Sequence, residues 1–192
     1  MRLILLGAPG AGKGTQGTLL AERYDVPHVS SGDILRQHVA EGTPLGVEVS
    51  AYTAAGELVP DDLVLAVIGR AVTEAMESGG YLLDGFPRTL AQAERAYALA
   101  TQGNITADAV LFLDVPDAVA IERLVDRSAT SGRADDASSA VIRHRLEVFH
   151  AQTEPLLEFY RDRGRLVTVT ATGSPDEVED DVRKALDAHL EG

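Results

Sequence analysis

Residues 7–15, with the sequence Gly-Ala-Pro-Gly-Ala-Gly-Lys-Gly-Thr, could hold the phosphates of a nucleotide. Glycines let backbone N–H groups approach phosphate oxygens closely. A helix that follows directs the positive end of its dipole at them, and Lys13 adds a full charge. The spacing fits the common phosphate-binding loop, but Gly14 stands where serine or threonine is usual, and the hydroxyl comes at Thr15. Phosphate binding is therefore better supported than direct ligation of Mg²⁺ by this loop.

A second candidate follows the apolar residues 81–83. Asp84 would lie at the carboxyl end of a buried strand, where phosphate-binding folds place an acidic partner for Mg²⁺, bound directly or through water. The ordinary alternative is a solvated aspartate at a turn, but the glycine-rich loop upstream favours the metal interpretation. Arg88 follows a Gly-Phe-Pro turn at the same edge, and arginine is suited to bidentate phosphate binding.

Two shorter polar segments are more ambiguous. Ser31 or Asp33 could simply cap a helix, but a cap does not explain Arg36 one turn further on the same edge. Residues 56–61, Gly-Glu-Leu-Val-Pro-Asp, are adequately explained by a helix C-cap and a proline turn.

An arginine set stands out in so acidic a chain. Arg123 and Arg127 are four residues apart and share a helix face, and Arg133 follows in a polar stretch. The ordinary alternative is exposed charge that contributes little to stability, and we accept it for Arg143. Arg127 and Arg133 flank a segment that could close over a transferring phosphoryl group.

The elements that must position these residues alternate along the chain. Strands are predicted at residues 2–6, 27–30, 81–84, 109–114 and 165–170. Helices are predicted at residues 12–23, 31–41, 44–55, 61–78, 90–102, 116–126, 139–163 and 175–190. This rhythm predicts a parallel sheet covered by helices on both faces, with ligands beyond the carboxyl ends of the strands. The polar residues 127–139 are predicted to form a mobile loop.

Length and composition restrict the class of protein. The chain has 192 residues, enough for one α/β domain, and a formal net charge of −13, which argues against binding to nucleic acid or anionic membranes. It has no cysteine, in keeping with a reducing compartment, and its apolar start is too short for a signal peptide. The histidines show no metal-ligand spacing and are interpreted as surface or core residues: His28, His38, His144, His150 and His189.

Five motifs together resemble those of the adenylate kinase family within the nucleoside monophosphate kinases. They are residues 7–16, 31–36, 58–61, 83–89 with Gln92, and 131–136, and they occur in family order. The resemblance implies an α/β, three-layer P-loop NTPase-type fold with a five-stranded parallel sheet flanked by helices. It also implies a single domain with a core (1–29, 60–126 and 138–192), an AMP-binding insert (30–59) and a short lid (127–137) that has no structural zinc.

The resemblance also assigns site residues. ATP would be bound by Gly10, Ala11, Gly12, Lys13, Gly14, Thr15, Arg123, Arg127 and Gly173. AMP would be bound by Ser31, Arg36, Glu57, Leu58, Val59, Gly85, Phe86, Pro87, Arg88, Gln92, Arg133 and Arg145. The catalytic set would be Lys13, Arg88, Arg127, Arg133 and Arg145, with Asp84 holding Mg²⁺ through water. An ungapped match places His144 where the last arginine belongs, so Arg143 and Arg145 compete, and we favour Arg145 because Leu146 follows it as in the family.

The implied reaction is reversible phosphoryl transfer from ATP to AMP, giving two ADP, with Mg²⁺ as the cofactor. The attacking phosphate oxygen of AMP is already anionic, so no general base is needed. The Ser31 hydroxyl and the Gln92 amide favour AMP over UMP or CMP. A UMP/CMP kinase and a non-catalytic adenylate sensor are the alternatives, and the arginine set argues against a sensor. We expect a cytoplasmic monomer whose partners are ATP, AMP and ADP, without nucleic acid or membrane.

Overall fold

The computed structural model describes residues 1–131 and 138–191. Within them, five strands form one parallel sheet in the order β2-β3-β1-β4-β5. The strands are β1 (Arg2–Gly7), β2 (His28–Ser30), β3 (Tyr81–Asp84), β4 (Ala109–Asp114) and β5 (Leu166–Thr170). The helices are α1 (Lys13–Tyr24), α2 (Ser31–Ala40), α3 (Pro44–Ala55), α4 (Asp61–Glu77), α5 (Leu90–Gln102), α6 (Asp117–Ser131), α7 (Ser139–Val148), α8 (Leu156–Arg161) and α9 (Pro175–Glu191), with a π-helical turn, η2 (Phe149–Thr153), after α7.

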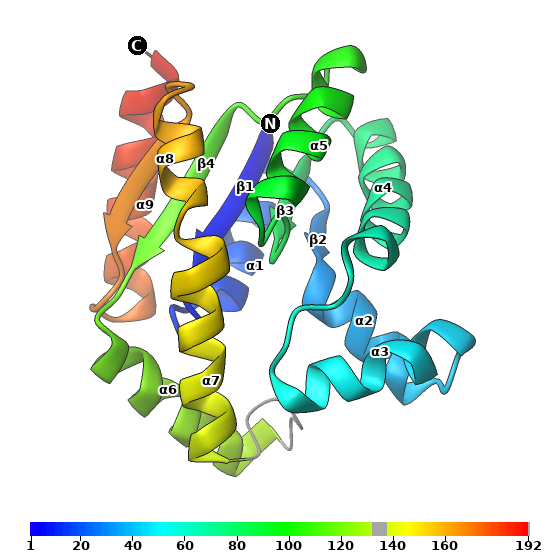
Figure 1. The fold of residues 1–192 in the computed structure, drawn as a ribbon. Coiled ribbons are helices and arrows are strands. Elements are labelled where there is room, and N and C mark those ends of the chain that lie inside the picture. Colours follow the sequence, from blue (N-terminus) through cyan, green and yellow to red (C-terminus); the bar gives the residue numbers. More distant parts are fainter. Residues whose placement is uncertain (132–137, 192) are drawn as a thin grey trace.

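The sheet is buried on both faces, which gives the molecule three layers (Figure 1). Alternate residues of β1 enter different cores: Leu3 and Leu5 pack with α1 and α9, whereas Ile4 and Leu6 pack with α4, α5 and α8. Near-continuous apolar strands are typical of parallel sheets covered on both sides. The three-layer α/β fold expected from the resemblance is therefore confirmed.

The topology gathers the carboxyl ends of the strands at one edge. β1 lies in the centre, with β3 on one side and β4 on the other, so Asp84 at the end of β3 is paired in register with Leu5 of β1 and Ser30 of β2. Beyond this edge extend α2 with α3 and α6 with α7 (Figure 1). Crevices at such an edge are where open α/β sheets bind ligands.

Helices α2 and α3 form a compact hairpin beside β2. Thr43 caps α3 by accepting a hydrogen bond from the N–H of Gly46, and Pro44 occupies the first helical turn, where its missing N–H costs nothing. Gly46 lies so close to α2 that an added Cβ would be 1.9 Å from the carbonyl oxygen of His38. The hairpin therefore depends on a glycine at this crossing.

Two predictions about the elements were wrong. The single helix predicted at residues 139–163 is divided into α7, η2 and α8, and Pro155 precedes the last of these. The loop predicted at residues 127–139 is helical at its start, because α6 continues to Ser131, and Ser138 already caps α7. The Ser128 hydroxyl donates to the carbonyl oxygen of Val125, so a polar side chain is satisfied within the helix. Within residues 1–131 and 138–191, no helix is both long and apolar enough to cross a membrane.

Candidate functional site

The glycine-rich loop between β1 and α1 is shaped by its glycines. Gly10 and Gly12 have φ of 86° and 91°, a conformation that favours glycine. An added Cβ at Gly10 would also lie 2.4 Å from the carbonyl oxygen of Ala120 in α6. No side chain caps α1, and the first residues of the helix, Lys13, Gly14 and Thr15, line the space beyond the sheet edge. Free N–H groups at a helix N-terminus form an anion-binding site.

Lys13 reaches back across this loop. Its Nζ donates to the carbonyl oxygens of Gly7, at 2.7 Å, and Ala8, at 3.0 Å. Burial lowers the pKa of Lys13 from its usual 10.5 to about 8; the carboxylate of Asp84 opposes this change, and nearby arginines add to it. The ammonium is thus held in a place where water no longer stabilises its charge and where an anion would.

Beyond the loop lies a cavity of about 450 Å³. Five arginines contribute to its lining together with the loop and Asp84: Arg36, Arg88, Arg123, Arg127 and Arg145. Arg123 also donates to the carbonyl oxygens of Ala171, at 2.8 Å, and Gly173, at 3.3 Å, and so fixes the loop between β5 and α9. The structure therefore brings together most of the residues that the sequence assigned to phosphate binding. Arg133 is the exception, since it lies outside the described residues.

His28 lies beside Asp84 without lining this cavity itself, a neighbour of the site that sequence reasoning treated as an ordinary histidine. Its Nε2 lies 3.7 Å from Oδ2 of Asp84, which is 7% exposed. The imidazole packs so closely on α1 that a Cβ at Gly17 would be 2.6 Å from the ring. A glycine inside a helix costs about 1 kcal/mol relative to alanine. The glycine at position 17, inside a predicted helix, was thus the sequence feature that could have indicated a bulky side chain packed against α1.

A second cavity of about 360 Å³ lies between the α2–α3 hairpin and the edge of the sheet. Its walls combine apolar side chains from the hairpin with polar groups from the ends of β3 and α5. The residues predicted for the AMP site that line it are Ser31, Arg36, Glu57, Leu58, Val59, Gly85, Arg88, Gln92 and Arg145. Arg36, Arg88 and Arg145 line both cavities, so the two spaces meet at these arginines.

The polar side chains of the second cavity are held in place by neighbouring backbone. The Ser31 hydroxyl donates to the carbonyl oxygen of Gly85 at 2.7 Å, which ties the start of α2 to the end of β3. The Arg88 Nε donates to the same carbonyl, also at 2.7 Å. The Gln92 amide is hydrogen bonded through both its oxygen and its nitrogen. These side chains are therefore preorganised before any ligand binds.

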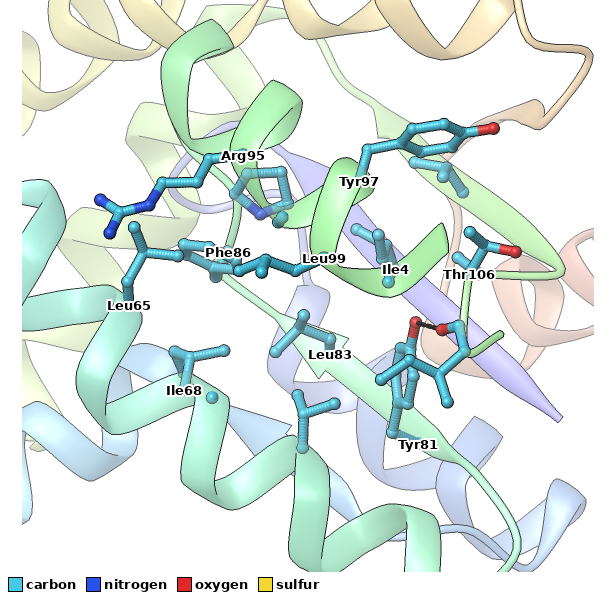
Figure 2. Close-up of a pocket in the computed structure, with 18 of the residues that line it drawn as sticks. Ile4, Leu65, Ile68, Tyr81, Leu83, Phe86, Arg95, Tyr97, Leu99 and Thr106 are labelled. Atoms are coloured by element: carbon cyan, nitrogen blue, oxygen red, sulfur yellow. Dashed lines mark hydrogen bonds between the residues drawn. The ribbon is translucent and has the colours of Figure 1, made fainter. Parts of the chain in front are cut away.

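The side chain of Phe86 points away from both cavities. It is 2% exposed and belongs to the core against α4, so contact with a ligand would have to come from its backbone. There it borders an apolar groove of about 500 Å³, lined by Leu65 and Ile68 of α4 and Leu99 of α5 (Figure 2). Tyr81 on its floor donates to the carbonyl oxygen of Ile105 at 3.0 Å. This lining does not suit phosphate, and the groove lies behind the Gly85–Arg88 turn.

The end of the hairpin contacts α7. His144 Nε2 lies 2.7 Å from Oε1 of Glu57, and this hydrogen bond raises the pKa of His144. Beside them, a Cβ at Gly56 would be 2.7 Å from Cγ of Arg145. Arg145 lines both cavities, whereas Arg143 lines neither and donates to the hydroxyl of Ser139 on its own helix. This placement agrees with the choice of position 145 as the last phosphate-binding arginine.

Comparison with known proteins agrees with this geometry. The family model for adenylate kinase matches residues 5–165. The chain is 44% identical to the adenylate kinase of Xanthomonas oryzae pv. oryzae (strain MAFF 311018), over 97% of this chain and 99% of that protein. It is 49% identical to the adenylate kinase of Parasynechococcus marenigrum (strain WH8102), over 96% and 98%. It is 45% identical to that of Synechococcus sp. (strain JA-2-3B'a(2-13)), over 97% and 96%.

Proposed function

The chain belongs to the adenylate kinase family, and we propose that its two connected cavities are the two nucleotide sites of that enzyme. The enzyme catalyses reversible phosphoryl transfer from ATP to AMP, which gives one ADP in each of the two nucleotide sites. The observation that carries the proposal is the lining of both cavities by Arg36, Arg88 and Arg145. Positive charge at the junction is what a phosphoryl group passing from one nucleotide to the other requires.

In this proposal the larger cavity holds ATP. Residues 10–15 and the Lys13 ammonium bind the phosphates, with the N–H of Ala11 holding the loop through the Ala8 carbonyl, and Arg123 and Arg127 neutralise the phosphate charge. Arg123 links this charge to the adenosine end, because it also holds the carbonyls of Ala171 and Gly173. The ATP adenine would lie against that loop.

The smaller cavity holds AMP. Arg36 and Arg88 bind its phosphate, and the apolar side chains of Leu35 and Val64 provide a surface for the base. Gln92 offers its amide to the hydrogen-bonding edge of adenine, as its chemistry allows. The backbone of residues 57–59 completes the wall toward α3.

The family resemblance implies Mg²⁺, and the donors around Asp84 fit this ion. Mg²⁺ prefers oxygen ligands, keeps several waters, and often binds through one carboxylate together with the phosphates of its substrate. Asp84 is a buried carboxylate that lines the ATP cavity, and Thr15 lines the same cavity. We propose that Asp84 holds Mg²⁺ through water. When bound, the ion supplies further charge neutralisation for the transferring group.

The chain's own contribution to catalysis is then positioning and electrostatics. Lys13, Arg88, Arg127 and Arg145 surround the transferring phosphoryl group, and the attacking AMP oxygen needs no base. Arg133 joins them from the proposed lid at residues 127–137, whose closure together with the insert at residues 30–59 excludes water. We further propose that the enzyme acts as a monomer in the cytoplasm.

Two arginine variants test the division into sites. Arg123→Ala should weaken ATP binding about tenfold or more and leave AMP binding unchanged, since a lost charge-assisted hydrogen bond costs about 1.5–3 kcal/mol. Arg36→Ala should weaken AMP binding more than ATP binding, because Arg36 binds the AMP phosphate but also lines the ATP cavity. Isothermal titration with each nucleotide measures both, and Arg143→Ala, which lines neither cavity, is the control. If Arg123→Ala weakened AMP and Arg36→Ala weakened ATP, the sites would have been assigned the wrong way round. Coupled assays with AMP, UMP and CMP test the nucleotide preference.

A further inference from the structure

The amide of Gln92 is held at both of its polar atoms. Its Oε1 accepts a hydrogen bond from the backbone N–H of Arg88 at 2.7 Å, and its Nε2 donates to Oδ1 of Asp61 at 2.6 Å. The residue is 2% exposed and lines the smaller cavity. A primary amide has two lone pairs on oxygen and two N–H groups, so one acceptor position and one donor position remain for a ligand.

The two partners permit only one orientation of this amide. A rotation by 180° would direct the NH₂ group at the N–H of Arg88, so that two donors would meet. It would also direct the amide oxygen at the carboxylate of Asp61, so that two acceptors would meet. Buried groups left unpaired in this way cost about 1–3 kcal/mol each, and here the groups would also repel. Asp61 and the Arg88 peptide therefore act together as an orientation lock.

The lock is itself rigid. The carbonyl of Arg88 accepts a hydrogen bond from the Thr153 hydroxyl at 2.8 Å, so the Arg88 residue is fixed on both of its backbone polar groups. Thr153 reaches it from the π-helical turn η2. At the other end, Asp61 is the first residue of α4, where the helix dipole favours a carboxylate. Thr89 caps α5 on the N–H of Gln92. Each member of the network is held by a different element.

We propose that Asp61 is a specificity-determining, positioning residue that makes the AMP site choose a 6-amino purine over a 6-oxo purine. The proposal rests on the proposed function, in which Gln92 faces the base of AMP. Adenine presents a donor at its 6-amino group and an acceptor at N1, and these match the free acceptor and donor of the locked amide. Hypoxanthine and guanine present an acceptor at O6 and a donor at N1, and they match only the rotated amide, which Asp61 forbids.

The isosteric variant Asp61→Asn tests this lock. The asparagine oxygen still accepts from Gln92 in the native orientation, so AMP remains a good substrate. Its NH₂ group can instead donate to the rotated amide, which removes one of the two repulsions. With ATP fixed, kcat/KM for AMP should stay within threefold of the parent. We expect kcat/KM for inosine monophosphate, which differs from AMP in its 6-oxo group and the accompanying proton on N1, to rise about tenfold. If Asp61 had a merely structural role, the variant would lower kcat/KM for both substrates and raise it for neither.

Three further measurements separate the outcomes. Asp62→Asn is the matched control, because this neighbouring carboxylate pairs with exposed Arg95 at 2.8 Å and should leave the substrate ratio unchanged. Asp61→Ala should lower kcat/KM for AMP and reduce the ratio of kcat/KM for AMP to that for inosine monophosphate, with an unchanged KM for ATP. Gln92→Ala should bring this ratio of AMP to inosine monophosphate close to one. If it does so while Asp61→Asn stays within twofold of the parent ratio, the lock is refuted and the base contact stands. If Gln92→Ala leaves the ratio unchanged, the proposed AMP site itself is wrong.

Discussion

Lys13 should make the folded protein less stable at neutral pH than it would be without this charge. Its pKa falls from 10.5 to about 8 because the ammonium is buried in the phosphate loop. Between these two values the unfolded chain binds more protons than the folded chain, so stability should rise with pH. By linkage, the destabilisation is about 3 kcal/mol at pH 7 and falls to below about 1 kcal/mol at pH 10.

The variant Lys13→Met removes the charge and keeps most of the side-chain volume. It also removes the hydrogen bonds to Gly7 and Ala8, and any pH dependence of these bonds is already contained in the pKa of Lys13. The difference in free energy of unfolding between variant and parent should therefore decrease by about 2–3 kcal/mol from pH 7 to pH 10. Urea unfolding at pH 7, 8, 9 and 10 measures this difference, and groups common to both proteins cancel.

Lys184→Met is the control, because this second lysine is 65% exposed and pairs with Asp181 on the surface of α9. Its difference from the parent should change by less than about 0.5 kcal/mol over the same range. A Lys13→Met difference that is equally flat would refute the reasoning, since it would mean that the ammonium is not destabilised in the fold. The variant should also lose phosphoryl transfer by about 10²–10³, because a charge that meets the transition state is gone.

Three further predictions concern the hairpin, its contact with α7, and the lid. Gly46→Ala should lower the free energy of unfolding by about 1–3 kcal/mol in urea titrations, because its Cβ would overlap the carbonyl of His38; an unchanged midpoint would contradict this packing. Glu57→Gln should lower the pKa of His144, followed by NMR of the imidazole. In the parent, stabilisation by this contact should be complete at acidic pH and lost as the pH rises through the raised pKa, and a pKa that the variant does not change would exclude Glu57 as its cause. Arg133→Ala should lower kcat about 10²–10³-fold with nearly unchanged ATP binding, and a kcat within twofold of the parent would rule out a catalytic role.

The sequence predicted best those elements that a short run of neighbouring residues is enough to define. β3 and β4 have the predicted bounds because each is an uninterrupted apolar run between turn signals. The break after α7 was missed because apolar residues continue at helical spacing through η2, and a π-helical turn changes hydrogen bonding without changing composition. The polar end of α6 was missed because composition does not show that Ser128 can bond to the preceding turn.

The candidate site divides in the same way. Motifs identified the residues that meet phosphate, because glycine, lysine and arginine are needed for that chemistry wherever it occurs. The partners that orient them could not be found, because they are distant in sequence and ordinary in type. Asp61 is 31 residues from Gln92, and Thr153 is 65 residues from Arg88. Such pairs arise only when the sheet and its helices bring separate segments together.

The environment of Lys13 has a consequence for covalent chemistry. Amines react with acylating reagents in their neutral form, and a pKa of about 8 gives Lys13 a large neutral fraction at mildly alkaline pH. The sequence contains two lysines, and the other lies on α9 at the surface. Labelling by an amine-reactive dye, measured at Lys13 itself and not as the total that includes the α-amino group, could therefore report whether the phosphate loop is occupied, since a bound nucleotide would shield Lys13 and keep it protonated. The same reactivity makes the loop a place where a nucleotide analogue bearing a mild electrophile would attach permanently.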